Sequence, residues 1–540
     1  MTRNSLQERC SKAPARPPAF RFGILSVAFG WVLGVIAASA VGAEPAGNPA
    51  GPAERAVREA ALPYQILEPL AVQDFGFEKT FLSFAQERLG LIARRAHLSV
   101  EHPIAVVLGM VFEPTQWQSK PLFKIDHPDL VQIFGNRKII SAADFTSEGN
   151  MQRVRRLVES KPSAESAVDD LGRRVQALLE VGDQLAIVPR SQGEWLTPDA
   201  VGKSAGTISP TYRAIVKAYA ALRDAFLKRD PAAFASAAGE LVKLNRDAAQ
   251  ATGMVPWRLR VDLLNTRLQP FFWSAVIYLL ATLVYVAALA LGGGRRLATA
   301  AFLLMVVGLV AQVTGLTFRT LLVGRAPMSN MYESLVFAVG GMVALAAILD
   351  RVYKNALVGL AGALLGFIFL VIAVKMPVHQ SRLNQLMPAL QSSWLTYHVT
   401  TVMLSYSAFA LSFFLSLTYL IKNAAGGAQA KLRILQALPS LEALDFFNYR
   451  IIAVGFPLLT VGIFTGAVWA ATAWGRPWAF DPKETWSAIT WLIYGVYLHT
   501  RLLGGWKGAR SVVLALVGFL AVLFTYLGVN FLLPGLHSYV

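Results

Sequence analysis

The chain has 540 residues, of which 55% are hydrophobic, with a mean hydropathy of +0.47 and a formal net charge of +17. This apolar content exceeds that of a soluble globular protein and predicts a polytopic membrane protein. Much of the positive charge lies in short loops between apolar runs, where the positive-inside rule explains it, so no nucleic-acid partner is expected. A single cysteine, Cys10, excludes an internal disulfide framework and any CxxCH sequence.

The first 43 residues have the pattern of a targeting segment. Basic residues precede an apolar stretch from 22 to about 41, which ends in small side chains. Both a cleaved signal peptide and an uncleaved membrane anchor fit this pattern, and the small residues favour the signal peptide. Either one exports the residues that follow.

Residues 44–62 are rich in Ala, Pro and Gly and are expected to form a linker. The next segment, 63–268, is polar enough to fold as a mostly helical, exported soluble domain. Ser-Pro at 209–210 and Asp-Pro at 230–231 suit the first positions of helices, whereas 103–141 has a shorter period that is compatible with strands. The domain's histidines are scattered, and no catalytic constellation is evident in it.

The C-terminal half, 269–540, consists of apolar runs of about 20 residues, the length that spans a bilayer as a helix. The overall prediction is an all-α polytopic membrane protein preceded by a mostly helical exported domain. About eight transmembrane helices are expected, at 271–292, 297–317, 334–350, 356–375, 398–421, 452–472, 486–502 and 511–533.

Charge predicts the orientation of these helices. If the soluble domain is exported, the inner loops carry more Lys and Arg than the outer loops, as the positive-inside rule requires. The outer loops are then 318–333, 376–397 and 473–485, joined on the same side by the C-terminal residues 534–540. These segments are therefore expected to converge on one face of the membrane.

A tryptophan-rich loop at 473–486 is the most unusual of these segments. Tryptophans at 469, 474, 478, 486 and 491 crowd the loop and its flanks. Membrane interfaces attract tryptophan, but a belt distributes it over many helix ends. This local density instead predicts a platform for a large flat apolar ligand, for which porphyrin is the obvious candidate.

The charged residues of the loop have a simpler explanation. In the sequence DPKET at 481–485, Asp481 suits an N-cap, the proline suits the first helical position, and Glu484 completes a capping box. Capping alone could account for both carboxylates, and the sequence leaves this alternative open.

Two histidines are candidate ligands of porphyrin iron, and a third, His499, is a candidate functional residue. His398 begins one predicted span and His537 follows the last, so both lie at the outer boundary beside the loop. A histidine at a helix end is also commonly a solvated interface residue. His499 lies deeper, within a span, where an ionisable side chain suggests a function, and Gly495 leaves space one turn above it.

The loop WGRPWAFDPKETWSAITWLIYGVYLHTR resembles the tryptophan-rich "WWD" signature of haem-handling proteins, and specifically the CcsA (ResC) family of system II cytochrome c biogenesis. Three further stretches match in the expected order. They are APMSNMYES at 326–334, LQSSWLTYHVTTVMLSYSAFA at 390–410 and FTYLGVNFLLPGLHSYV at 524–540. The 63–268 segment is similar, more weakly, to the extension of longer CcsA forms.

The resemblance implies that haem b is presented at the outer face for thioether attachment to the CxxCH of apocytochrome c, and that haem moves across the membrane. It makes His398 and His537 the axial ligands of the iron and His499 a transit ligand. In the loop, the residues that match the haem-presenting signature of the family are Trp474, Trp478, Asp481 and Trp486. No residue is assigned a catalytic role, and whether the chain is an enzyme stays open; a subunit of a holocytochrome c synthase (haem lyase) fits.

The resemblance further implies a bacterial cytoplasmic (inner) membrane protein with a separate CcsB (ResB)-like partner. A CcmC-type haem chaperone or exporter without ligase activity is the alternative, and a proton or small-solute transporter is a rival from another class. One position departs from the family pattern, because Phe480 stands where W-x-W-D has its second tryptophan. Phenylalanine keeps an aromatic face and lacks the indole N–H.

Overall fold

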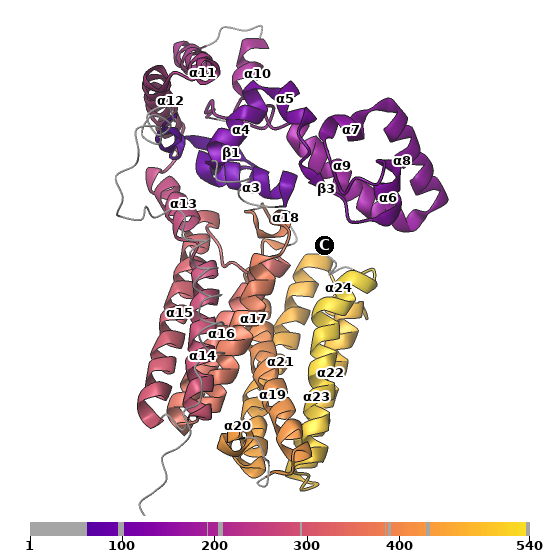
Figure 1. Cartoon of the computed structure of the whole chain (residues 1–540). Helices are drawn as coiled ribbons and strands as arrows, with labels where there is room; N and C mark the ends of the chain where they lie inside the picture. The colour runs from indigo at the N-terminus through magenta and orange to yellow at the C-terminus, as the bar shows by residue number, and fades with distance from the viewer. Residues whose placement is uncertain are drawn as a thin grey trace, which may run out of the picture. The chain divides into compact units, whose positions relative to one another are not determined.

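The computed structural model describes residues 62–94, 102–191, 193–203, 209–291, 294–383, 385–386, 390–427 and 433–535. The expected signal peptide or anchor, nearly all of the linker, and His537 lie outside the described residues. Throughout the described chain, helices dominate and the only strands are four short ones in two antiparallel pairs. Figure 1 shows the long helices of the C-terminal half running side by side.

The N-terminal domain, residues 62–268, is mostly helical, as expected. Its elements are η1 (Tyr64–Leu67), β1 (Ala71–Asp74), β2 (Phe77–Thr80), α3 (Phe81–Ala93), α4 (Pro103–Phe112), α5 (Pro114–Ser119), β3 (Phe123–Lys124), α6 (Pro128–Ile133), β4 (Ile139–Ile140), α7 (Ala142–Thr146), α8 (Glu148–Ser160), η2 (Pro162–Ala164), α9 (Glu165–Leu179), α10 (Pro198–Lys203), α11 (Pro210–Lys228), α12 (Pro231–Ala251) and α13 (Pro256–Leu268). The segment 103–141 does contain strands, but β3 and β4 have two residues each and most of it is helical.

Local sequence signals set several of these boundaries. Both helices predicted from X-Pro dipeptides begin there, and the Asp230 carboxylate accepts hydrogen bonds from the backbone N–H groups of Ala232 and Ala233, each at 3.0 Å. Buried Asn245 of α12 ties the elements together: it accepts from the Ala71 backbone and donates to the carbonyls of Ala71 and Ile187. One apolar core therefore unites α12, β1 and the segment around 187.

The capping box of α7 predicts an acid-sensitive contribution to stability. Arg137 and the Ser141 backbone lower the pKa of Asp144 to about 2. Because the folded pKa lies below the unfolded value of about 3.8, the stabilisation is present above pH 4 and is lost as the pH falls through 2. We expect Asp144→Asn to cost about 1 kcal/mol at pH 7, allowing for solvent screening, roughly half of that at pH 3, and little at pH 1. Hydrogen exchange of the α7 amides measures the difference.

The membrane half follows directly. Its helices are α14 (Pro270–Ala290), α15 (Gly294–Val323), α16 (Met331–Tyr353), α17 (Ala356–Val374), α18 (Val378–Ser381), α19 (Ser393–Ala424), α20 (Arg433–Ala437), α21 (Leu441–Trp474), α22 (Pro482–Leu502) and α23 (Ala509–Leu523), continued by a π-helical turn, η5 (Phe524–Gly528), and α24 (Val529–Leu532). All eight predicted spans are helical.

Seven helical segments in the described chain are long and apolar enough to cross a membrane, and they include α14–α17, α19, α21 and α23–α24. The chain is therefore a multi-pass membrane protein. The eighth predicted span corresponds to α22, which is not one of these seven. This helix has 21 residues, but Lys483, Glu484, His499 and Arg501 make it less apolar than the others. It nevertheless packs against α21 and α23.

Helices α19 and α21 share the most extensive contact of the bundle, and glycines of α21 face α19. A Cβ at Gly455 would lie 2.8 Å from the Phe409 ring, and one at Gly462 would lie 2.6 Å from Val402. Small residues let membrane helices approach closely, which is how they gain packing energy without a hydrophobic driving force. This contact positions the start of α19 against the end of α21.

Candidate functional site

At one end of the membrane helices, four separate chain segments line an open cleft of about 190 Å³. The lining comes from 328–334, 390–406, 463–487 and 525–530. These lining segments overlap the four stretches that resemble family motifs, and they include parts of the three loops predicted to converge; most of the C-terminal residues 534–540 lie outside the described chain. The lining of the cleft is mostly apolar, as in most ligand pockets.

His398 lies on the wall of this cleft in the second turn of α19. Its Nδ1 lies 2.7 Å from the Gly462 carbonyl oxygen, which can only accept, so Nδ1 carries the proton and donates. In the neutral imidazole the lone pair is then on Nε2. Fixing one ring nitrogen by a backbone hydrogen bond is how proteins orient a ligating histidine.

The α21 backbone also shapes the imidazole's position. A Cβ at Gly466 would lie 2.7 Å from both Nδ1 and Cε1 of His398, a distance no side chain can keep. The ring of Trp469 stacks parallel to the imidazole, with centroids 6.2 Å apart and an interplanar angle of 10°. The absence of a side chain at Gly466 therefore creates the slot that His398 occupies.

The tryptophans divide into lining and supporting side chains. Trp469 and Trp478 line the cleft. Trp474 ends α21 and packs edge-on against Trp469 at 4.7 Å, while Trp486 packs against Phe524 at 4.2 Å. Trp474 and Trp486 therefore stand behind the lining.

The capping box predicted at 481–485 is present. The Asp481 carboxylate accepts from the Lys483 backbone at 3.0 Å, and Glu484 accepts from the backbones of Ala479 and Asp481 at 2.8 and 3.1 Å. Glu484 and Lys483 also line the cleft, whereas Asp481 is buried in the cap. The cap thus delivers one anionic and one cationic side chain to the cleft's edge.

Phe480 lies in the same loop in the left-handed backbone region, with φ of 55°. Its side chain is 79% exposed and does not line the cleft, although its ring meets Trp478 edge-on at 6.1 Å. The residue that departs from the family pattern therefore lies at the rim of the platform.

Of the other two predicted histidines, His499 is not among the residues that line the cleft, and His537 lies outside the described residues. His499 is exposed on the last turn of α22. The space expected at Gly495 is present, since a Cβ there would make only ordinary contact, 3.8 Å, with Phe456. His537 lies beyond the described chain, whose last residue, Gly535, approaches Asp481: a Cβ on it would lie 2.7 Å from the carboxylate.

Sequence reasoning missed a buried ion-pair cluster behind the wall formed by 328–331. The Glu333 side chain, 1% exposed, pairs with Arg319 at 2.8 Å and Arg325 at 3.1 Å. Its second oxygen also accepts from the Ser329 backbone at 2.9 Å, and Ser329 lines the cleft. The sequence places Glu333 in the loop directly before the apolar run at 334–350, and only the structure, in which α16 begins at Met331, places it inside a helix.

The fold and the cleft define a polytopic helical membrane protein with an aromatic, histidine-bearing site built from its C-terminal half. That half matches the family model of the cytochrome c assembly proteins over residues 328–537.

The chain is also similar to curated proteins named cytochrome c biogenesis protein CcsA. The one from Porphyra purpurea is 37% identical over 300 residues, covering 48% of this chain and 93% of the relative. Those from Guillardia theta and Prochlorococcus marinus are 43% and 39% identical, covering 77% and 78% of each relative. This chain belongs to the CcsA family of cytochrome c biogenesis proteins.

Proposed function

We propose that this chain binds haem in the cleft and presents it for thioether attachment to the CxxCH of apocytochrome c. The observation that carries the proposal is His398, whose ring is oriented by the Gly462 carbonyl on the wall of a cleft that Trp469 and Trp478 also line. Imidazole is a common axial ligand of haem iron. The side chains of Trp469 and Trp478 supply flat apolar faces suited to a porphyrin ring.

His537 is the proposed second axial ligand. The described chain ends at Gly535 against Asp481 of the capping box, two residues before His537 in the sequence. Two imidazoles would occupy both axial positions of the iron, so that the reaction would take place at the edge of the porphyrin ring. Each cysteine S–H then adds across a vinyl group, forming a C–S bond while the proton goes to the other vinyl carbon. The chain's contribution is orientation and proximity.

His499 is the proposed transit ligand, and its exposure supports a role for a second protein. The His499 side chain is exposed on α22, near the space at Gly495. Arg501, two residues later, forms an ion pair with Asp445 at 2.6 Å. The exposed imidazole in the last turn of α22 is accessible to a second membrane protein. A CcsB (ResB)-like chain in the bacterial inner membrane would cover it, with the cleft on the periplasmic side.

The visible spectrum of the purified full chain, isolated with its CcsB-like partner, tests this proposal. We expect a haem spectrum in the wild-type protein and a weakened or reshaped one in His398→Ala, with added imidazole restoring the original bands. Identical bands in both proteins would refute the ligand assignment. Absence of porphyrin absorption would favour a transporter. Haem that binds and never labels a CxxCH peptide would favour a CcmC-type chaperone.

Lys483 predicts a pH dependence of haem binding. Burial lowers the pKa of its ammonium group to about 8, although the Asp481 carboxylate opposes the shift. If this cation attracts a haem carboxylate, affinity is constant below pH 8 and falls above it, by up to about tenfold per pH unit. We expect Lys483→Arg, which stays charged, to abolish the fall in spectral titrations from pH 7 to 9.5. An unchanged fall would assign it to another group.

A further inference from the structure

A connecting segment between α17 and α19, here called the strap, touches both the N-terminal domain and the cleft. The strap is defined by its described residues 378–383, 385–386 and 390. Near its start, the Val378 side chain fills the space over Gly90 of α3, so that a Cβ on this glycine would overlap it. Further along, the Gln385 side chain lies equally close to Gly76. The strap is thus held against two elements of the N-terminal domain.

The other end of the strap joins the wall of the cleft. Leu386 and Leu390 pack in a small apolar cluster with Leu395, Trp469 and Trp474. Leu390 and Trp469 both line the cleft, and Trp469 stacks on His398. A displacement of the strap would therefore reach the imidazole through one intervening side chain.

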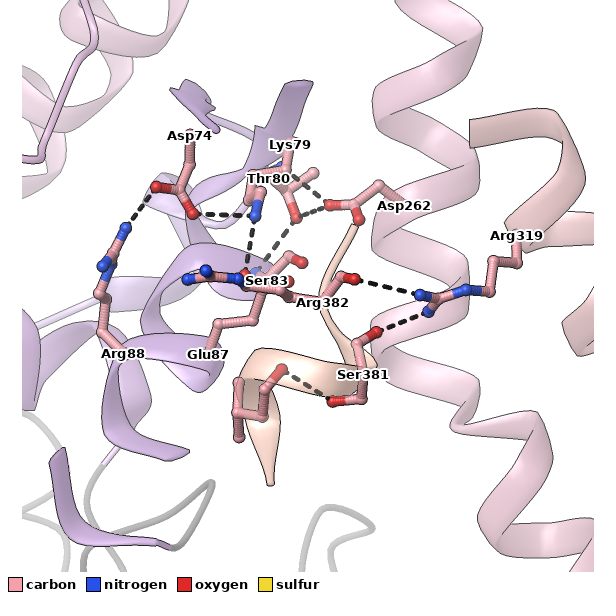
Figure 2. Close-up of polar contacts among 11 residues, drawn as sticks. Asp74, Lys79, Thr80, Ser83, Glu87, Arg88, Asp262, Arg319, Ser381 and Arg382 are labelled. Atoms are coloured by element: carbon pink, nitrogen blue, oxygen red, sulfur yellow. Dashed lines mark hydrogen bonds and ion pairs between the residues drawn. The ribbon is translucent and has the colours of Figure 1, made fainter. Parts of the chain in front are cut away.

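The middle of the strap is fastened to the opposite wall by Arg319. This guanidinium donates to the carbonyls of Ser381 at 2.7 Å and Arg382 at 3.2 Å, as Figure 2 shows. Its Nε donates to Glu333, which in turn holds the Ser329 backbone at the cleft. One buried side chain therefore joins the strap to the wall formed by 328–331.

The hairpin β1–β2 of the N-terminal domain contacts the strap through its turn. Its two-residue turn is Phe75-Gly76, with φ of 50° and 78°, which is the pattern of a type I′ turn. Asparagine or aspartate is strongly preferred at the first position, and a bulky residue there is strained. The Phe75 ring lies 3.7 Å from the guanidinium carbon of Arg382 on the strap.

A buried ion cluster stiffens this hairpin. Asp74, directly before the turn, pairs with Arg88 and with Lys79, and Lys79 also pairs with Glu87 at 2.7 Å (Figure 2). The Arg88 guanidinium carbon is 5.8 Å from the Phe75 ring. The ion cluster therefore holds the strained Phe75 in contact with Arg382. Strained backbone of this kind is usually retained where it serves a function.

We propose that the N-terminal domain positions the strap through the Phe75–Arg382 contact, and thereby sets the wall of the cleft that carries Trp469 and His398. Phe75 and Arg382 are positioning residues. Their effect on haem rests on the proposed function, whereas their effect on the strap does not.

Phe75→Asn separates the contact from the fold, because asparagine is the better turn residue and removes only the ring. In the full chain without haem, we expect the backbone amides of 378–386 to exchange about fivefold faster, the factor expected from losing one partly desolvated cation–π contact. Phe75→Trp, which keeps an aromatic face, should restore the wild-type rate. The amides of β1 and β2 should exchange no faster than in the wild type.

The second measurement is the release of haem from the same three proteins to a haem-scavenging globin. We expect Phe75→Asn to release haem several-fold faster and to show altered absorption bands, and Phe75→Trp to match the wild type. Unchanged strap exchange in Phe75→Asn would overturn the proposal. Faster strap exchange with unaltered haem spectrum and release would overturn the link to the cleft. If the wild type binds no haem, the proposed function fails while the exchange result still decides on the strap contact.

Discussion

Gly466→Ala is expected to displace the imidazole of His398 and to change the haem spectrum as strongly as removing the histidine. The new methyl group would lie 2.7 Å from two ring atoms, and the ring cannot move without losing its hydrogen bond to Gly462. Overpacking of this kind costs about 1–3 kcal/mol. Visible absorption of the purified protein and its thermal unfolding measure the two effects.

Gly455→Ala is the matched control for this substitution. It lies on the same helix and the same contact with α19, and its methyl group would lie 2.8 Å from the Phe409 ring. We expect a similar loss of stability and an unaltered haem spectrum. Equal spectral changes in the two variants would show that general loosening of α19 and α21, and not the slot for His398, governs haem binding.

Glu333→Gln is expected to have the largest effect on stability. The substitution keeps the size of the side chain and leaves Arg319 and Arg325 without their shared carboxylate in a mostly buried site. Breaking a buried ion pair by removing the charge of one partner costs about 3–5 kcal/mol. Denaturant unfolding in detergent, followed by tryptophan fluorescence, measures the loss.

Arg325→Met provides the comparison, because it leaves the Arg319–Glu333 pair intact. Arg325 is also the more exposed of the two arginines, at 20% against 10% for the side chains. We expect its effect to be clearly smaller. Equal losses in the two variants would mean that the carboxylate is not the centre of the cluster.

Signals that act over a few residues were read correctly from the sequence. The capping box at Asp481 and Glu484 depends on four consecutive positions, and the spans depend on continuous apolar runs. Successive loops of a multi-pass protein lie on alternating sides of the membrane, and this alternation groups the loops that line the cleft. These inferences needed no knowledge of how side chains pack.

Packing decided what the sequence could not. Trp474 and Trp486 were grouped with Trp478, yet only Trp478 lines the cleft, because the end of α21 turns Trp474 against Trp469. Arg319 falls within the outer loop predicted at 318–333. Helix α15 instead continues to Val323, and the guanidinium is buried beside Glu333. Hydropathy marks the apolar centre of a helix and not its ends, so charged residues in the last turns were assigned to loops.

The lengths of α19 and α21 have a consequence for how two very different substrates could meet. With 32 and 34 residues, these helices measure about 48 and 51 Å at 1.5 Å per residue, against a hydrocarbon thickness of about 30 Å. His398 lies near the start of α19 and Trp469 near the end of α21, so both lie towards the ends of helices that are longer than the hydrocarbon layer is thick. Under the proposed function, an apolar tetrapyrrole and a hydrophilic, unfolded polypeptide would meet at this boundary, and neither would have to enter the other's solvent.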